Sequence, residues 1–101
     1  MTWATLPQRL ANMATSERQR RNILDLVEGL RDCPAPKEVT TNPYDGGVSC
    51  HWPGYEIATY DDRFETYEFE DGRTEIKHWP RGLDESVSPG LIAEARMFAA
   101  R

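Results

Sequence analysis

Residues 45–80 read DGGVSCHWPGYEIATYDDRFETYEFEDGRTEIKHWP, and this stretch decides the fold. Along it, apolar and polar side chains alternate with a period of two, which is typical of strands that have one buried face. Turn-forming residues interrupt the alternation at Gly46-Gly47, Pro53-Gly54, Asp61-Asp62-Arg63 and Asp71-Gly72. The pattern predicts an antiparallel meander of four short strands, at about residues 48–52, 55–60, 64–69 and 74–79.

On both sides of this stretch the apolar residues change to helical spacing. Thr5, Ser16 and Ser88 are N-cap residues, and prolines follow Thr5 and Ser88 closely. We therefore expect helices at about residues 5–14, 16–32 and 88–100. Residues 33–43 contain three prolines and are expected to form an extended linker over the core. The sequence predicts one α+β domain, residues 1–101, in which the N-terminal helices and the C-terminal helix pack on one face of the four-stranded meander.

Loop lengths predict the register of the sheet. Asp71-Gly72 suits a two-residue hairpin, Asp61–Arg63 a three-residue loop, and Pro53-Gly54 a loop of four residues rather than two. A slip of one residue would turn a whole strand over, so the choice of loops decides which face is buried. In this register the face that we expect to be covered by the helices collects Val48, Cys50, Trp52, Tyr55, Ile57, Tyr67, Phe69 and Ile76.

The opposite face provides the candidate site. In the expected register it carries the row His51, Glu56, Glu68 and Glu75, with Tyr60, Phe64 and Trp79 beside the row. Neighbours in such a row lie roughly 5 Å apart. Carboxylates next to aromatic rings suit the docking of a surface rich in Arg or Lys. A charged outer face is also common in antiparallel sheets, so a merely solvated surface is the alternative interpretation.

The charge is unevenly distributed over the chain. The net charge is −5, but residues 1–37 hold six basic and four acidic side chains, whereas residues 38–101 hold six basic and thirteen acidic ones. An acidic sheet surface attracts a basic protein and disfavours direct binding of nucleic acid. The cluster Arg18, Arg20 and Arg21 lies in the second expected helix, where it either forms ion pairs or contacts an acidic partner.

The sequence predicts neither catalysis nor a bound cofactor or metal ion. Cys50 and His51 are adjacent on an expected strand and point to opposite faces, so they do not share a metal. His51 with Glu56 and His78 with Glu65 are interpreted as cross-strand pairs, and a small enzyme or ligand-binding domain is the less favoured alternative. The two cysteines favour free thiols in a cytoplasmic protein over a disulfide, and neither a secretory signal nor a membrane span is expected.

Two resemblances bear on function. The Pro-rich linker and the strand after it resemble those of small uncharacterised bacterial and phage proteins, through Pro34, Pro36, Val39, Pro43, Asp45, Gly46, Gly47, Val48 and Trp52. In size and acidity the chain also resembles phage anti-CRISPR proteins and toxin-immunity proteins. That resemblance implies an inhibitor that blocks a basic, often nucleic-acid-binding, surface of its target, in the host cytoplasm if a phage encodes it. The alternatives are an immunity protein and a homo-oligomeric structural protein that forms a homodimer through an edge strand.

Overall fold

Helices lie at the two ends of the chain, and the strands lie between them. The computed structural model of the protein describes residues 2–81 and 87–100. Its elements are α1 (Leu6–Met13), α2 (Glu17–Leu30), β1 (Glu38–Thr41), β2 (Val48–Trp52), β3 (Tyr55–Thr59), β4 (Arg63–Glu70), β5 (Arg73–Pro80) and α3 (Pro89–Ala99). The strands pair antiparallel in the order β1-β2-β3-β4-β5. The predicted α+β class, with an antiparallel meander between helices, is therefore confirmed.

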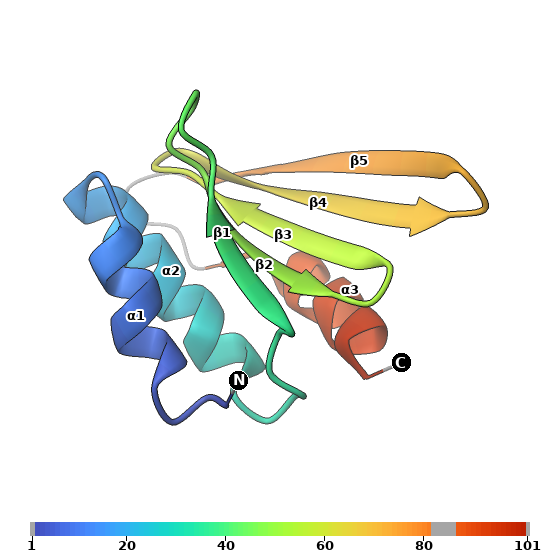
Figure 1. Cartoon of the computed structure of the whole chain (residues 1–101), viewed down its shortest axis with the longest axis horizontal. Coiled ribbons are helices and arrows are strands. Elements are labelled where there is room, and N and C mark those ends of the chain that lie inside the picture. Colours follow the sequence, from blue (N-terminus) through green and yellow to red (C-terminus); the bar gives the residue numbers. More distant parts are fainter. Residues whose placement is uncertain (1, 82–86, 101) are drawn as a thin grey trace.

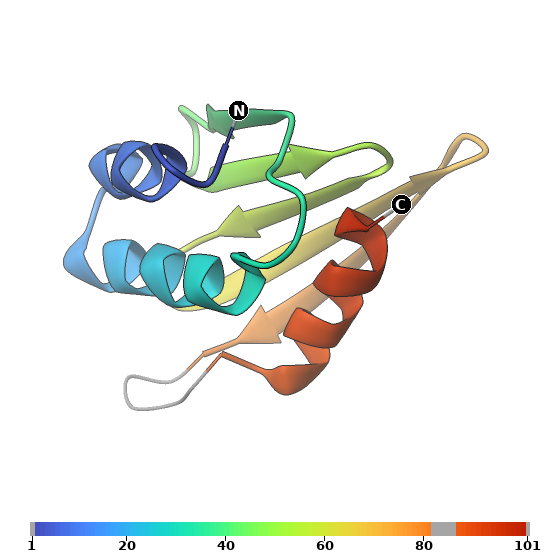
Figure 2. The same cartoon turned by 90° about the horizontal axis from the view of Figure 1, so that it is seen from below.

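The three helices of the described residues lie on the same side of the sheet, and none of them lies on the other side (Figures 1 and 2). We call this other side the helix-free face. The core lies between the helices and the sheet, where Leu10, Leu26 and Leu30 meet Val48 and Ile57. Burial of such side chains contributes roughly 25 cal/mol per Å² of apolar surface, which makes this layer the main source of stability.

The fold has a fifth strand that the sequence analysis assigned to the linker. β1 pairs with β2 along its whole length, with Val39 opposite Cys50 and Thr41 opposite Val48. Val39, Thr40 and Thr41 are β-branched, which favours a strand, and Val39 is buried in the core. The prolines around this segment limit the strand to four residues at the edge of the sheet. The prediction of a four-stranded sheet is therefore wrong.

The predicted pairing of β3 with β4 is wrong by one residue. The structure pairs Thr59 with Phe64, whereas the predicted three-residue loop paired Tyr60 with Phe64. The loop has two residues, because the backbone N–H of Tyr60 donates to the carbonyl of Arg63 at 2.9 Å. The predicted registers of the other two hairpins are confirmed, with His51 opposite Glu56 and Glu68 opposite Glu75. The predicted four-residue loop at Pro53-Gly54 is wrong, since Trp52 pairs with Tyr55 and the loop has two residues.

Polar side chains of α2 explain why this register is stable. Gln19 and Asn22 are buried on the side of α2 that faces the sheet. The Gln19 amide donates to the carbonyl of Thr59, and the Asn22 amide donates to the carbonyl of Tyr60, both at 2.8 Å. Because a buried polar group without a partner costs free energy, these bonds fix where β3 ends and the turn begins. The predicted N-cap of α2 is confirmed, since the Ser16 hydroxyl accepts the N–H of Gln19. Thr5 and Ser88 lie at the N-cap positions of α1 and α3, but their side chains form no capping hydrogen bond.

The shift turns β4 and β5 over relative to the prediction. Phe64 is 1% exposed and Trp79 packs against the core, although both were expected on the outer face. Conversely, Phe69 and Ile76 are 47% and 50% exposed, although both were expected in the core. Tyr67 moves outward with them, because it shares their strand phase.

Replacement of two phenylalanines tests this register. Phe64→Ala should lower the free energy of unfolding by about 3–5 kcal/mol, because it leaves a cavity in the core. The control Phe69→Ala should lower it by roughly 1 kcal/mol or less, because that ring is half exposed. Urea unfolding followed by tryptophan fluorescence measures both values. A larger loss for Phe69→Ala than for Phe64→Ala would support the rejected register.

Candidate functional site on the helix-free face

The seven residues predicted to form one binding patch lie on two sides of the sheet. His51, Glu56 and Tyr60 lie on the helix-free side. The other four lie on the helix-bearing side, namely Phe64, Glu68, Glu75 and Trp79. The predicted row is therefore interrupted, since Glu56 lies opposite Tyr67 rather than Glu68. The physical cause is the one-residue shift of β4, which exchanges the two faces of β4 and β5.

Apolar side chains that were predicted to be buried form an exposed strip on the helix-free face. The rings of Tyr67 and Phe69 are stacked, with centroids 6.4 Å apart and an angle of 9° between their planes. Ile76 lies directly opposite Tyr67 on the neighbouring strand. Half-exposed aromatic and aliphatic side chains next to one another are typical of a surface that binds another protein. We call Tyr67, Phe69 and Ile76 the apolar strip.

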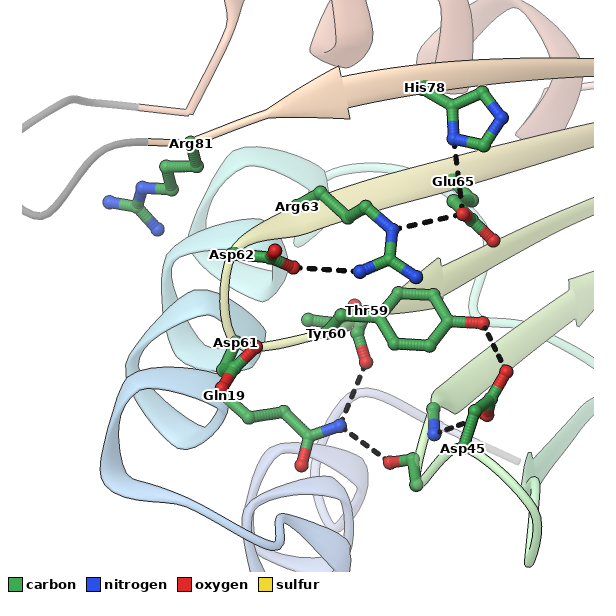
Figure 3. A network of polar contacts seen from close by, with 12 residues as sticks. Gln19, Asp45, Thr59, Tyr60, Asp61, Asp62, Arg63, Glu65, His78 and Arg81 are labelled. Carbon is green, nitrogen blue, oxygen red and sulfur yellow. Dashed lines mark hydrogen bonds and ion pairs between the residues drawn. The ribbon is translucent and has the colours of Figure 1, made fainter.

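Glu65 is the centre of a polar network beside the apolar strip (Figure 3). The carboxylate accepts hydrogen bonds from Arg63 Nε at 3.0 Å and from the Tyr67 hydroxyl at 2.8 Å, and His78 Nδ1 lies 3.1 Å away. Burial alone would raise the pKa of Glu65, but the two hydrogen bonds and the charges of Arg63 and His78 lower it below its ordinary value. Glu65 is therefore a buried anion that holds neighbouring side chains of β4 and β5 in place.

A second chain of polar contacts links β1, β2 and β3. The Thr40 hydroxyl and His51 Nε2 are 2.8 Å apart, and His51 Nδ1 lies 3.6 Å from Glu56 Oε1. A hydroxyl, an imidazole and a carboxylate in this order resemble a nucleophile with its base and orienting acid. The distance from His51 to Glu56 exceeds that of a hydrogen bond, however, and the three groups lie on a sheet surface. We interpret the chain as a cross-strand contact, and the absence of catalysis stays a prediction.

The loop between β1 and β2 rises from the helix-free face (Figure 1). Its residues form one wall of an open hollow. The Tyr60 hydroxyl donates to Asp45 in this loop at 3.0 Å, and a Cβ on Gly47 would lie 3.0 Å from the Tyr60 ring. Glycine therefore lets the loop lie close to that ring. The hollow has a volume of about 450 Å³ and is lined by Thr40, Thr41, Asn42, Pro43, Tyr44, Asp45, Ser49, Glu56, Ala58, Tyr60, Glu65 and Tyr67.

The hollow is negatively charged. Glu56, Glu65 and Asp45 supply carboxylates, and its other polar groups are mainly hydroxyls and amides. Within the described strands, Arg63 is the only Lys or Arg that the register places on the helix-free face. Its guanidinium lies 4.0 Å from the centre of the Tyr60 ring and binds both Asp62 and Glu65. The hollow therefore has the charge and depth to receive a cationic side chain.

Glu68 and Glu75 belong to a separate acidic surface. They lie opposite one another on the helix-bearing side of the β4–β5 hairpin, which projects beyond the helices (Figure 2). Burial and then the charge of Glu75 raise the pKa of Glu68. The nearby cation Lys77 is bound to Glu94 of α3. This pair is therefore a like-charge contact at the tip of the molecule and not part of the hollow.

Comparison with known proteins does not assign this surface to a family. A scan against protein-family models found no match, and searches of curated proteins and of solved structures found no significant match. The resemblances drawn from the sequence therefore stay predictions. Within residues 2–81 and 87–100, no helix is long and apolar enough to cross a membrane, and no three potential ligand side chains are grouped around a metal site. Among the described residues Cys33 and Cys50 form no disulfide, and Cys50 is buried.

The network around Glu65 makes stability depend on pH. The pKa of Glu65 is lower in the folded protein than its ordinary value, so its stabilising effect is present above the ordinary pKa and is lost as the pH falls through the folded-state pKa. Glu65→Gln should therefore destabilise the protein by roughly 1–3 kcal/mol at neutral pH and by less in acid. Urea unfolding at both pH values tests this, with the exposed Glu70→Gln as the control. An equal loss at both pH values would contradict it.

Proposed function

We propose that the protein is a binding protein without catalytic activity, and that its helix-free face docks on a positively charged surface of another protein. The single observation that carries this proposal is the apolar strip of Tyr67, Phe69 and Ile76 next to the acidic hollow. The proposal keeps the partner class expected from the sequence and replaces most of the residues that were expected to contact it.

The apolar strip supplies the anchor for such a complex. Aromatic side chains contribute a large contact area, and they carry much of the binding energy where they lie at the centre of an interface. Phe69 and Ile76 are about half exposed in the isolated chain, so their remaining surface is available for burial. The stacking of Tyr67 on Phe69 fixes both rings before binding, which lowers the entropy lost on association.

The hollow determines the charge of the partner. Its carboxylates favour Arg or Lys, and its hydroxyls provide further hydrogen-bond acceptors. Glu56 is the most available anion. Glu65 already has two hydrogen bonds and an adjacent imidazole, and Asp45 accepts hydrogen bonds from the Tyr60 hydroxyl and the Gly47 N–H. We infer that an Arg or Lys of the partner enters the hollow while an apolar side chain of the partner covers Tyr67 and Phe69.

An inhibitor is the role that this chemistry suits best. Proteins that bind nucleic acid do so through clusters of Lys and Arg. An acidic protein that occupies such a cluster excludes the nucleic acid by steric hindrance and by charge. The net charge of −5 supports this mode of action. We therefore propose an inhibitor of the anti-defence type as the finer function, with a toxin-immunity protein as the related candidate.

Two substitutions on the helix-free face test the docking surface. Glu56→Lys reverses a charge in the hollow, and Tyr67→Ala removes one stacked ring. Each should raise the dissociation constant of the complex by about tenfold or more. The partner is first captured from a bacterial lysate with the tagged wild-type protein, identified and purified. Calorimetry then measures its affinity for each variant.

The matched control is Glu70→Lys, which makes the same change of charge on the helix-bearing side of the hairpin. It should change the affinity by less than about threefold, because it lies outside the proposed interface. Thermal unfolding confirms that each variant is folded. Equal affinity for wild type and both helix-free-face variants, or a captured partner whose contact surface is acidic, would reject the proposal.

A further inference from the structure

The free edge of β5 is the longer of the two unpaired edges of the sheet. β1 and β5 are the outer strands, with four and eight residues. The first four residues of β5, Arg73–Ile76, are all exposed, and no strand of residues 2–81 or 87–100 lies beyond β5 (Figure 2). An exposed strand edge is a template for pairing with another strand, so an edge of this length needs an explanation.

The backbone of β5 has the geometry for such pairing. Asp71 and Gly72 both have positive φ, at 47° and 76°, which gives a two-residue hairpin turn. Pairs in an antiparallel ladder alternate from this turn onward, so Thr74, Ile76 and His78 direct their N–H and C=O groups toward the free edge. Pro80 also faces the free edge, but proline has no backbone N–H and so leaves no donor there without a partner. Three residues thus offer backbone hydrogen bonds along the edge.

We propose that β5 pairs antiparallel with β5 of a second copy of this chain, around a two-fold axis at Ile76. The two five-stranded sheets would then form one continuous sheet. Each Ile76 lies opposite its counterpart in this register. Going outward from the axis, the remaining pairs across the interface are Glu75 with Lys77, Thr74 with His78, and Arg73 with Trp79.

The order of charges and the length of the paired edge together select this register. A two-fold axis perpendicular to the sheet pairs residues that share a face, so the axis passes through a single residue of β5. With the axis at Ile76, Glu75 meets Lys77 twice, once on each side of the axis. With the axis at Glu75, two glutamates meet and Arg73 meets Lys77. With the axis at Lys77, two lysines meet. With the axis at Thr74, Arg73 would meet Glu75 twice, but only residues 73–75 of β5 would pair, whereas the axis at Ile76 pairs residues 73–79. Opposite charges in cross-strand pairs stabilise a sheet, and like charges destabilise it.

Pairing also reduces a charge repulsion that is present within the single chain. Glu75 lies opposite Glu68, and the charge of Glu75 contributes to the raised pKa of that residue. Within one chain, Lys77 already lies near this pair while it is bound to Glu94. A second copy brings its own Lys77 to the other side of Glu75, so that the two acids gain a second nearby cation. Charged residues on an edge strand also prevent aggregation, but that role requires no particular order of charges.

Both faces of the sheet fit a continuous arrangement. On the helix-free face, Ile76 lies next to Tyr67, so the pairing joins two apolar strips across the axis. On the other face, both copies of α3 lie on the same side of the joined sheet. Among its described exposed residues, α3 has the apolar Ala93 and Met97, and Met97 is 58% exposed. Exposed methionine is common at surfaces that bind other proteins.

Exchange of the two charges provides a test that depends on the register. Glu75→Lys places two lysine pairs in the interface and should weaken the dimer by roughly tenfold or more. Lys77→Glu places two glutamate pairs there and should weaken it similarly. Mixed in equal amounts, the two variants should form a dimer again, because each glutamate then meets a lysine of the other chain. Light scattering and analytical ultracentrifugation measure the mass, and the wild type should show twice the mass of one chain.

Hydrogen exchange gives a second readout that requires no variant. In the dimer the amides of Thr74, Ile76 and His78 should be protected, and their protection should fall on dilution, whereas those of Glu75 and Lys77, which bond to β4, should be protected throughout. This readout covers the case in which Lys77→Glu disturbs the fold through its contact with Glu94. A wild type that is monomeric at all concentrations, or a Glu75→Lys variant as dimeric as the wild type, would overturn the proposal. Neither outcome affects the docking proposal for the helix-free face.

Discussion

Two side-chain amides of α2 hold the turn between β3 and β4, and the orientation of half of the sheet depends on them. Gln19 donates to the carbonyl of Thr59, and Asn22 donates to the carbonyls of Tyr60 and Asp61. Both residues are buried, so an amide without a partner would cost about 1–3 kcal/mol. A slip of one residue would break these bonds and would also turn Phe64 out of the core. Polar and apolar requirements therefore select the same register.

Much of the fold follows from local signals in the sequence. The α+β class, the helix that begins after Ser16 and the Asp71-Gly72 hairpin depend on caps and turn residues that act over a few positions. The β3–β4 turn has no such signal, because Asp-Asp-Arg is compatible with loops of two or three residues. Gln19 and Asn22 occupy positions of α2 that face the core. Polar residues at such positions were the one signal in the sequence that could have indicated polar contacts at this turn.

The candidate site was predicted less well than the fold because it depends on the one register that local signals leave open. His51 and Glu56 belong to a hairpin whose register was predicted, and they lie where they were expected. The error in β4 placed Phe64 in the predicted site and left out Tyr67, which the alternation had assigned to the core. In β4 the aromatic residues change phase between Phe64 and Tyr67, so the apolar pattern alone fits either face. When several strands form a surface, an error in the register of one strand therefore changes which residues are predicted to lie on that surface.

The two proposed surfaces meet at Ile76, and this has a consequence for how a partner would bind. Ile76 is part of the apolar strip on its outward side, and its backbone groups lie at the edge of β5. A dimer formed through that edge would present two acidic hollows on one continuous face. Linked sites of this kind bind a partner with repeated basic clusters more tightly than one site alone, provided that the spacing matches. Surfaces that bind nucleic acid carry such repeats, because the phosphates to which they bind are regularly spaced. Dimerisation would therefore favour an extended basic surface over a single exposed Arg or Lys.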